Sequence, residues 1–311
     1  MPRSRSRKVP KARFAAIVAL IVVSGVVAFL VACPPAPSPP SSRPPAAPGE
    51  PAAPTGPVPM IPEPLSARPP TAATLPPERP QPEVPGLVSI IIDDAGYDLR
   101  ELQVFLDLPL PLTIAVLPGL PHSAEAARRV SAAGKDLILH APMEPDGAQN
   151  PGPDVILTGM SPERIRELLD EDFASVPGAI GMNNHMGSKA TADEAVMRVV
   201  LGYLKERGKL FVDSRTTPDT AAPRVASSLD MPMLQRNIFL DDDTREEQIA
   251  DWFGRAVEEA RTRGTAIAIG HVQNRGVADI LRAAEQTLAS QGVHLARLGE
   301  VLARQERKPA L

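Results

Sequence analysis

The chain has 311 residues and 37 prolines, 21 of which lie between Pro34 and Pro85. Its formal net charge is -4, but residues 1–86 carry nine Lys and Arg against four Asp and Glu, which leaves 24 against 33 for the rest. An acidic region with 3% aromatic residues lacks the basic surface and stacking rings of a nucleic-acid binder, and the single cysteine, Cys33, excludes both an intramolecular disulfide and a cysteine-based zinc site.

The first 32 residues predict export. Residues 1–13 are a basic cytoplasmic segment with six Lys or Arg and no acid, and residues 14–32 are 19 residues without a charge. Such a run is long enough to cross a bilayer core of about 30 Å as a helix, with its basic flank in the cytoplasm. We expect an uncleaved signal anchor in the inner membrane. The alternative is a lipoprotein cleaved before Cys33, because Leu30–Cys33 resembles a lipobox.

Residues 33–86 are rich in Pro and Ala and show no apolar periodicity. Such a composition does not bury a core, so we expect a disordered tether, which polyproline II segments would extend. The tether would hold the rest of the chain away from the membrane, in the periplasm or another extracytoplasmic space.

Residues 87–307 predict one α/β domain in which short apolar strands alternate with helices. We expect strands at 87–92, 112–117, 136–139, 179–182, 209–212, 232–236, 265–270 and 292–296. We expect helices at 98–107, 122–133, 161–175, 192–207, 220–229, 244–263, 276–290 and 298–306. Eight strand-then-helix units predict a parallel sheet, either closed as a TIM-like barrel or open and doubly wound.

In both architectures the functional site lies beyond the C-terminal ends of the strands. The polar residues found there are Asp93, Asp94, His140, Glu144, Asn184, His185, Asp213, Arg215 and His271. Carboxylates with imidazoles suit a catalytic zinc or similar divalent ion that keeps a position open for water. Each residue also has a structural alternative, such as a turn cap or a salt bridge, and Asp241-Asp242-Asp243 is interpreted as an acidic run at a helix start.

Five strings in this order resemble the divergent polysaccharide deacetylase family, a branch of the NodB-like carbohydrate esterases. They are Ile90–Tyr97 (IIIDDAGY), Leu139–Pro145 (LHAPMEP), Met182–Ser188 (MNNHMGS), Phe211–Thr216 (FVDSRT) and Ile269–His271 (IGH), and they cover residues 86 to 302. The resemblance implies a deformed (β/α) barrel of the NodB type. It also implies metal-dependent removal of N- or O-acetyl groups from a sugar polymer.

Carried over by residue, the resemblance implies that Asp93 is the catalytic base, Asp94 a metal ligand and His271 the general acid. His140 matches the first histidine of the family's His-x-x-x-His metal motif, but Glu144 stands in the second place. The third ligand is therefore Glu144 or His185, and we favour His185. The arginine that steadies the base has no clear counterpart, although Arg215 is a candidate. Asp213 is a further catalytic candidate, and Asn184 a further ligand or supporting residue.

These features predict a membrane-anchored, zinc-type deacetylase whose partner is a glycan, such as a cell-envelope polysaccharide. The alternative is a catalytically silent glycan-binding or envelope scaffold protein on the same barrel. A metal-dependent phosphoesterase is disfavoured, because phosphates need cationic groups and Arg215 is the one cation in the five strings. No oligomeric state is predicted.

Overall fold

The computed structural model describes residues 84–307, with the side chains of residues 285–287 excepted. The predicted basic segment, membrane segment and nearly all of the tether lie outside the described residues. Within residues 84–307, no helix is both long enough and apolar enough to cross a membrane.

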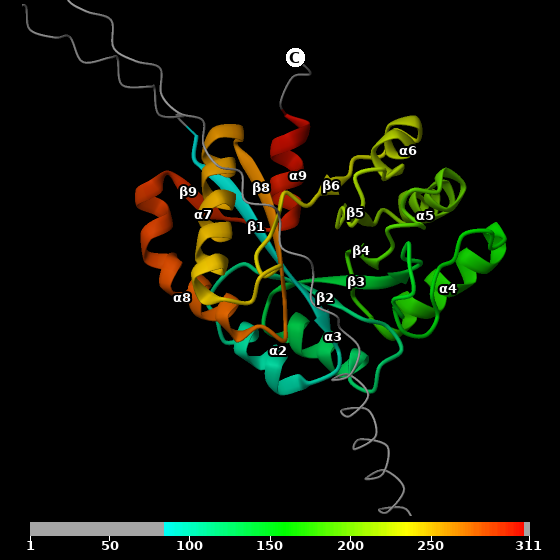
Figure 1. The fold of residues 1–311 in the computed structure, drawn as a ribbon, viewed down its shortest axis with the longest axis horizontal. Helices are drawn as coiled ribbons and strands as arrows, with labels where there is room; N and C mark the ends of the chain where they lie inside the picture. Colours follow the sequence, from blue (N-terminus) through cyan, green and yellow to red (C-terminus); the bar gives the residue numbers. More distant parts are fainter. Residues whose placement is uncertain (1–83, 308–311) are drawn as a thin grey trace, which may run out of the picture. The chain divides into compact units, whose positions relative to one another are not determined.

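The described strands form one nine-stranded parallel sheet, which curls into a partial barrel (Figure 1). Their bounds are β1 (Gly86–Ala95), β2 (Thr113–Val116), β3 (Asp136–Met143), β4 (Gly181–Met186), β5 (Leu210–Asp213), β6 (Leu234–Gln235), β7 (Ile238–Phe239), β8 (Thr265–His271) and β9 (Val293–Leu295). The order across the sheet is β6-β5-β4-β3-β2-β1-β8-β7, and β9 pairs with the beginning of β1.

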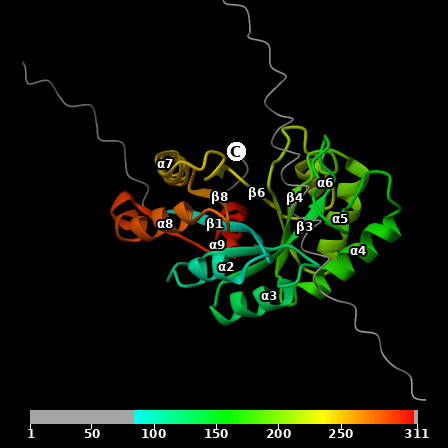
Figure 2. The same cartoon turned by 60° about the horizontal axis from the view of Figure 1, so that its bottom comes forward.

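Helices cover the outer face of this sheet (Figures 1 and 2). They are α2 (Leu99–Leu106), α3 (Ser123–Ala132), α4 (Pro162–Ser175), α5 (Glu194–Glu206), α6 (Ala222–Ser228), α7 (Glu246–Arg263) and α8 (Arg275–Leu288), whereas α9 (Leu298–Glu306) packs on the inner side. Ser161 and Asp193 cap the starts of α4 and α5 with their side chains, as their sequence positions predict. The main apolar core lies between these helices and the sheet.

A second, smaller core fills the inside of the curl, because strand side chains alternate between the two faces. Leu298 and Val301 of α9 pack into this inner core. Its strand residues include Ile91, Ile138, Val212 and Ile269. Two positions further along the same strands, the period of two places Asp93, His140, Ser214 and His271 on the inner side at the C-terminal ends.

The sheet has a seam between β6 and β7. β6 pairs with β5 and β7 pairs with β8, while only Arg236 and Asn237 separate the two strands along the chain. The Arg236 N–H still donates to the Asp213 carbonyl (2.9 Å), and the Asn237 N–H donates to the Ile267 carbonyl (2.8 Å). The described strands form no ladder between β6 and β7, so the chain itself closes the curl here. The predicted strand 232–236 is thus replaced by two strands of two residues each.

Candidate active site

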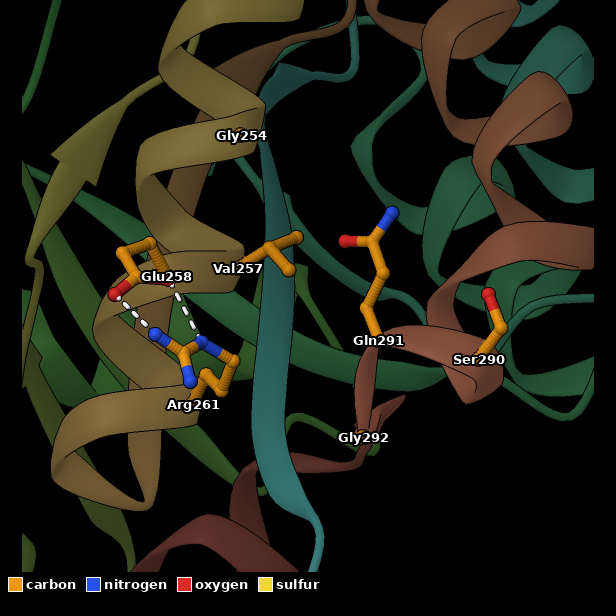
Figure 3. Close-up of a pocket in the computed structure, with 7 residues that line it drawn as sticks. All are labelled: Gly254, Val257, Glu258, Arg261, Ser290, Gln291 and Gly292. Atoms are coloured by element: carbon orange, nitrogen blue, oxygen red, sulfur yellow. Dashed lines mark hydrogen bonds and ion pairs between the residues drawn. The ribbon is translucent and has the colours of Figure 1, made fainter. Parts of the chain in front are cut away.

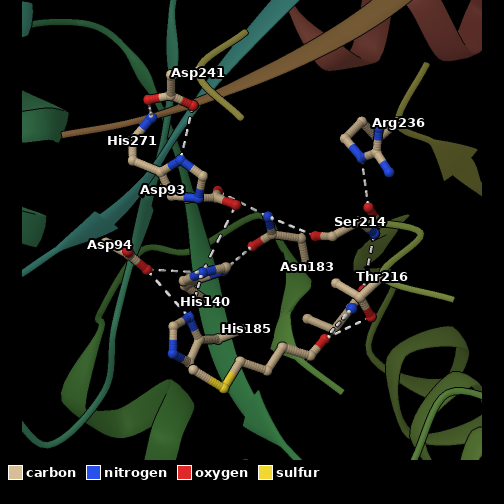
Figure 4. A network of polar contacts seen from close by, with 12 residues as sticks. Asp93, Asp94, His140, Asn183, His185, Ser214, Thr216, Arg236, Asp241 and His271 are labelled. Atoms are coloured by element: carbon tan, nitrogen blue, oxygen red, sulfur yellow. Dashed lines mark hydrogen bonds and ion pairs between the residues drawn. The ribbon is translucent and has the colours of Figure 1, made fainter. Parts of the chain in front are cut away.

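Both carboxylates of the Asp93-Asp94 pair reach the inner side of the curl because β1 carries a bulge. The register between β1 and β2 shifts between Ile92 and Ala95, and Asp94 adopts a left-handed conformation with φ 65°. Successive residues of a regular strand point to opposite faces, whereas a bulge places one extra residue and can re-aim its side chain. The bulge therefore brings Asp94 to the same site as Asp93 (Figure 4).

Asp94, His140 and His185 direct three donor atoms toward one point (Figure 4). Asp94 Oδ1 is 3.2 Å from His140 Nε2 and 3.1 Å from His185 Nδ1, and the two ring nitrogens are 3.0 Å apart. Asp94 Oδ1 is buried and has no well-aligned hydrogen bond among the described residues. The Asp94 and His185 side chains are 19% and 18% exposed, against 3% for His140, so the triangle opens to solvent on one side.

Asn183 connects this triangle to Asp93. Its amide nitrogen donates to Asp93 Oδ1 (2.9 Å) and to Ser214 Oγ (3.3 Å), so its amide oxygen faces His140 Nδ1 at 2.8 Å. Nδ1 must then carry the proton of a neutral His140 ring, which leaves the Nε2 lone pair free for an ion. A ligating histidine held in this way by its other nitrogen is the common arrangement at metal sites.

His271 approaches from β8, next to Asp93 in the register of β1 and β8. Its Nδ1 is 2.9 Å from Asp241 Oδ1, and its backbone N–H donates to Asp241 Oδ2 (2.9 Å). Burial favours the neutral ring, but the Asp241 hydrogen bond and the Asp241, Asp93 and Asp94 charges outweigh it and raise the pKa of His271 to about 9. The imidazole is therefore protonated at neutral pH.

Burial and the neighbouring charges have opposite effects on the pKa values of Asp93, Asp94 and His140. Burial raises the pKa of Asp93, although the nearby His140 and His271 pull in the other direction. Burial opposes ionisation of Asp94 as well, yet the contacts with His140 and His185 hold the pKa of Asp94 far below its usual range. The two carboxylates also raise the pKa of His140 against the effect of its own burial. The site thus favours positive charge among these ring nitrogens, as a proton or as a cation.

Two residues predicted for the site do not join this cluster. The Glu144 carboxylate accepts hydrogen bonds from the Thr158 hydroxyl (2.6 Å) and N–H (2.7 Å) and pairs with Lys189 Nζ (2.6 Å). Those contacts lower the pKa of Glu144 to about 2. Asp213 lies on the outward-facing side of β5, where it accepts from the Arg215 N–H and the Thr220 hydroxyl, each at 2.8 Å. These contacts give Asp213 a structural role at the end of β5.

Asn184 and Arg215 also make contacts outside the cluster. Asn184 donates to the Met186 carbonyl (2.7 Å) and accepts from the Ser214 N–H (2.9 Å), which fixes the backbone after β4 and β5. Arg215 is exposed and donates to Gln235 Oε1 (3.3 Å). The guanidinium within electrostatic reach of Asp93 is that of Arg236, whose Nε donates to the Ser214 carbonyl (2.6 Å).

Asn183, Asp241 and Arg236 are the supporting residues that the sequence analysis did not assign. Strand alternation could have identified Asn183, because it shares the inner side of β4 with His185. Asp241 was interpreted as part of an acidic run at a helix start. Its position beside His271 depends on the short strand β7, for which the sequence carries no strong signal.

A separate hollow of about 340 Å³ lies near the opposite end of β1 (Figure 3). It is lined by Val257, Glu258 and Arg261 of α7 and by the turn at Gln291 and Gly292. Glu258 and Arg261 bond to each other there at 2.7 and 2.8 Å. Because Gly292 pairs with Gly86 at the start of β1, this hollow is not part of the Asp93 site.

Residues 90–302 match the family described as divergent polysaccharide deacetylase. The match spans more than half of the chain and contains every residue of the cluster. The chain therefore belongs to the divergent polysaccharide deacetylase family.

The chain is also similar to two curated proteins. The chain is 33% identical over 214 residues to an uncharacterized protein of Haemophilus influenzae, covering 69% of this chain and 76% of that protein. It is 36% identical over 190 residues to the uncharacterized protein YibQ of Escherichia coli, covering 61% of this chain and 60% of YibQ.

Among solved structures, an uncharacterized protein from Agrobacterium tumefaciens C58 has the same fold. Its TM-score is 0.67 at 20% sequence identity, and the match covers 70% of this chain and 89% of that chain. The curled α/β fold is thus an architecture already seen in an experimental structure.

Proposed function

We propose that this chain is a metal-dependent deacetylase that hydrolyses N- or O-acetyl groups of an extracytoplasmic polysaccharide. The observation that supports this most directly is the triangle of donor atoms from Asp94, His140 and His185 beside the buried Asp93 carboxylate. Membership of the family supports a glycan as the substrate and deacetylation as the reaction.

The donor set fits a zinc-type ion. Ligand atoms about 2.0–2.1 Å from a tetrahedral zinc lie about 3.3 Å apart, close to the 3.0–3.2 Å that separate the three donor atoms here. The partly exposed Asp94 and His185 leave one side open for water and substrate. When bound, such an ion lowers the pKa of a coordinated water to about 7 and polarises a carbonyl.

Asp93 is the proposed general base. Asn183 donates a hydrogen bond to Asp93 Oδ1. The other oxygen, Asp93 Oδ2, is 3.7 Å from His140 Nε2 and so faces the triangle where the attacking water would sit. The raised pKa of Asp93 brings this carboxylate closer to the working pH, which improves its ability to accept a proton.

His271 is the proposed general acid. Its Nδ1 is held by Asp241, so Nε2 is the atom that can give a proton to the departing nitrogen or oxygen of the sugar. The pKa of His271 near 9 keeps that proton in place at neutral pH. Base and acid thus lie side by side on β1 and β8.

We also propose that residues 14–32 anchor the chain in the inner membrane and that residues 33–86 carry the domain into the periplasm. The apolar run and the proline-rich composition support this arrangement. This arrangement would place the domain outside the cytoplasm. A cell-envelope polysaccharide is a substrate found there.

Acetate release tests the proposal. Purified full-length protein supplied with zinc, cobalt or nickel should release acetate from an acetylated glycan, and Asp93→Asn should lower kcat by about 10²- to 10⁴-fold because a general base is lost. The variant should keep its bound metal, since Asp93 supplies none of the three donor atoms. Absence of acetate from every acetylated glycan tested with each metal would overturn the proposal.

A further inference from the structure

A polar groove lies at the seam between β6 and β7. It consists of two adjoining hollows of about 360 Å³ and about 440 Å³, which share Arg215, Arg236, Asn237 and Arg263 in their walls. We call these four residues the arginine groove. The other lining residues are Thr217, Pro218, Met233, Gln235, Glu259, Thr265 and Gln305, so no aromatic ring lines it.

The groove carries an excess of positive charge in a domain that is acidic overall. Glu259 is the one carboxylate in its walls, and it is already engaged by Asn237 Nδ2 (2.7 Å) and Arg263 Nη1 (3.2 Å). Most arginines of the described region form ion pairs, but among residues 84–307 neither Arg215 nor Arg236 has a carboxylate within 4.0 Å.

Arg215 and Arg236 are also held next to each other. Arg236 donates to the Ser214 carbonyl (2.6 Å) and the Arg215 carbonyl (2.8 Å), and its guanidinium stacks over Phe239 at 3.7 Å. Two cations in contact with the same turn repel each other. The Asp242, Asp213 and Asp93 carboxylates act on Arg236 from a distance, but none of them forms an ion pair with it within 4.0 Å. A bound anion would reduce this repulsion, and planar guanidinium groups match the geometry of carboxylates and phosphates. A carboxylate is the anion that fits the glycan substrate proposed above.

Arg236 connects one part of the groove to the Asp93 site, while Thr265 at the start of β8 and Gln305 of α9 line the part farther from that site. Arg236 bonds the carbonyl of Ser214, and the hydroxyl of Ser214 accepts from Asn183, which in turn holds Asp93 (Figure 4). A polymer that places one acetyl group at Asp93 and continues past Arg236 would bring its neighbouring sugars into the groove.

We propose that the arginine groove binds a carboxylate on a neighbouring sugar, so that the substrate is an acidic, acetylated polysaccharide. This inference rests on the proposed function for its choice of a glycan. It goes beyond the deacetylase assignment by naming the charge of the substrate and the residues that recognise it.

Calorimetric binding of a matched pair of ligands tests the proposal on the full-length protein. One ligand is an N-acetylated oligosaccharide with carboxylates, and the other is the same oligosaccharide with its carboxyl groups reduced to alcohols. The acidic ligand should bind about tenfold or more tightly than the reduced ligand, and the difference should shrink at high salt. Arg215→Gln should remove most of that difference, whereas Arg128→Gln, a charge change on α3, should leave it intact. Arg263→Gln provides a second variant if Arg215→Gln does not fold.

The outcomes separate this proposal from the proposed function. Equal binding of both ligands to the wild-type chain, or an undiminished preference in folded Arg215→Gln, would overturn the groove assignment. If both oligosaccharides release acetate at the same rate and bind equally, the deacetylase proposal stands and the groove fails. If the acidic ligand binds through Arg215 but neither ligand releases acetate, the groove stands and the deacetylase proposal fails.

Discussion

Asp94 shows how a single backbone conformation can create a site. A non-glycine residue at φ 65° is uncommon, and aspartate is among the residue types that tolerate it best. The bulge that holds Asp94 there re-aims its carboxylate toward His140 and His185. In a regular strand, one of the two adjacent aspartates would point away from the site. Only one carboxylate would then remain beside His140 and His185.

Asp241 offers a test at the level of a single hydrogen bond. Asp241→Asn removes the negative charge that favours the protonated imidazole, while the buried surroundings of His271 continue to disfavour it. We expect the pKa of His271 to fall from about 9 toward or below its ordinary value of 6.5. NMR titration of the imidazole measures this directly, and the alkaline limb of the kcat profile should move down in parallel. A pKa unchanged by the substitution would rule out Asp241 as the positioning residue.

At the scale of the elements, much of the architecture could be predicted because strands and helices differ in the period of their apolar residues. The strand β1, for example, is readable from Leu87 to Ile92 as an apolar run interrupted only by Ser89. The end of β3 was harder to predict from the sequence. The strand was predicted to stop at Leu139, but it continues to Met143 because β4 pairs with it as far as Met186.

The candidate site was predictable in part for the same reason. Polar residues directly after apolar strands must meet at one edge of a parallel sheet, and this principle identified Asp93, Asp94, His140, His185 and His271. It also selected Asp213, whose carboxylate faces outward. The principle identifies the end of a strand, but it does not tell which of the last residues faces inward, and in β5 the inward residue is Val212. Asp241 could not be found in this way, since its place depends on long-range pairing of β7 with β8.

Helix α4 contains a buried carboxyl group that should make stability depend on pH. Asp172 is 4% exposed, and its Oδ2 has no hydrogen-bond partner within residues 84–307. Burial, together with the charges of Asp154 and Glu171, raises the pKa of Asp172 to about 7 from an ordinary value of 3.8. The folded state therefore binds a proton more tightly than the unfolded state, so this group favours folding at low pH.

The sign of this effect gives a prediction. The contribution of Asp172 to stability should be lost as pH rises from about 4 to about 7, and the loss has an upper limit on the order of 4 kcal/mol. Asp172→Asn should abolish this part of the pH dependence and stabilise the protein at pH 8. Urea unfolding at pH 5 and pH 8 measures both effects, with Glu163→Gln on the exposed side of α4 as the control. Equal stabilisation at the two pH values would contradict the assignment.

For the whole molecule, the proposed arrangement is a catalytic domain on a tether, anchored by residues 14–32. Cys33 distinguishes the two possible anchors. If the segment is an uncleaved signal anchor, Cys33→Ser should leave the full-length protein in the membrane fraction with unchanged mass. A lipoprotein would instead depend on the thiol, and the same substitution would block its lipid attachment and cleavage. Membrane fractionation with mass spectrometry of the purified chain separates the two results.

The metal content of the purified full-length protein is the most direct test of the account as a whole. After loading with zinc and removal of the excess, elemental analysis by mass spectrometry should find one ion per chain. His185→Ala should lose that ion, while Glu144→Gln should keep it, because Glu144 is held by Thr158 and Lys189 away from the donor atoms. A wild-type chain that retains no ion, or a Glu144→Gln variant that loses it while His185→Ala keeps it, would contradict the site on which the proposed chemistry depends.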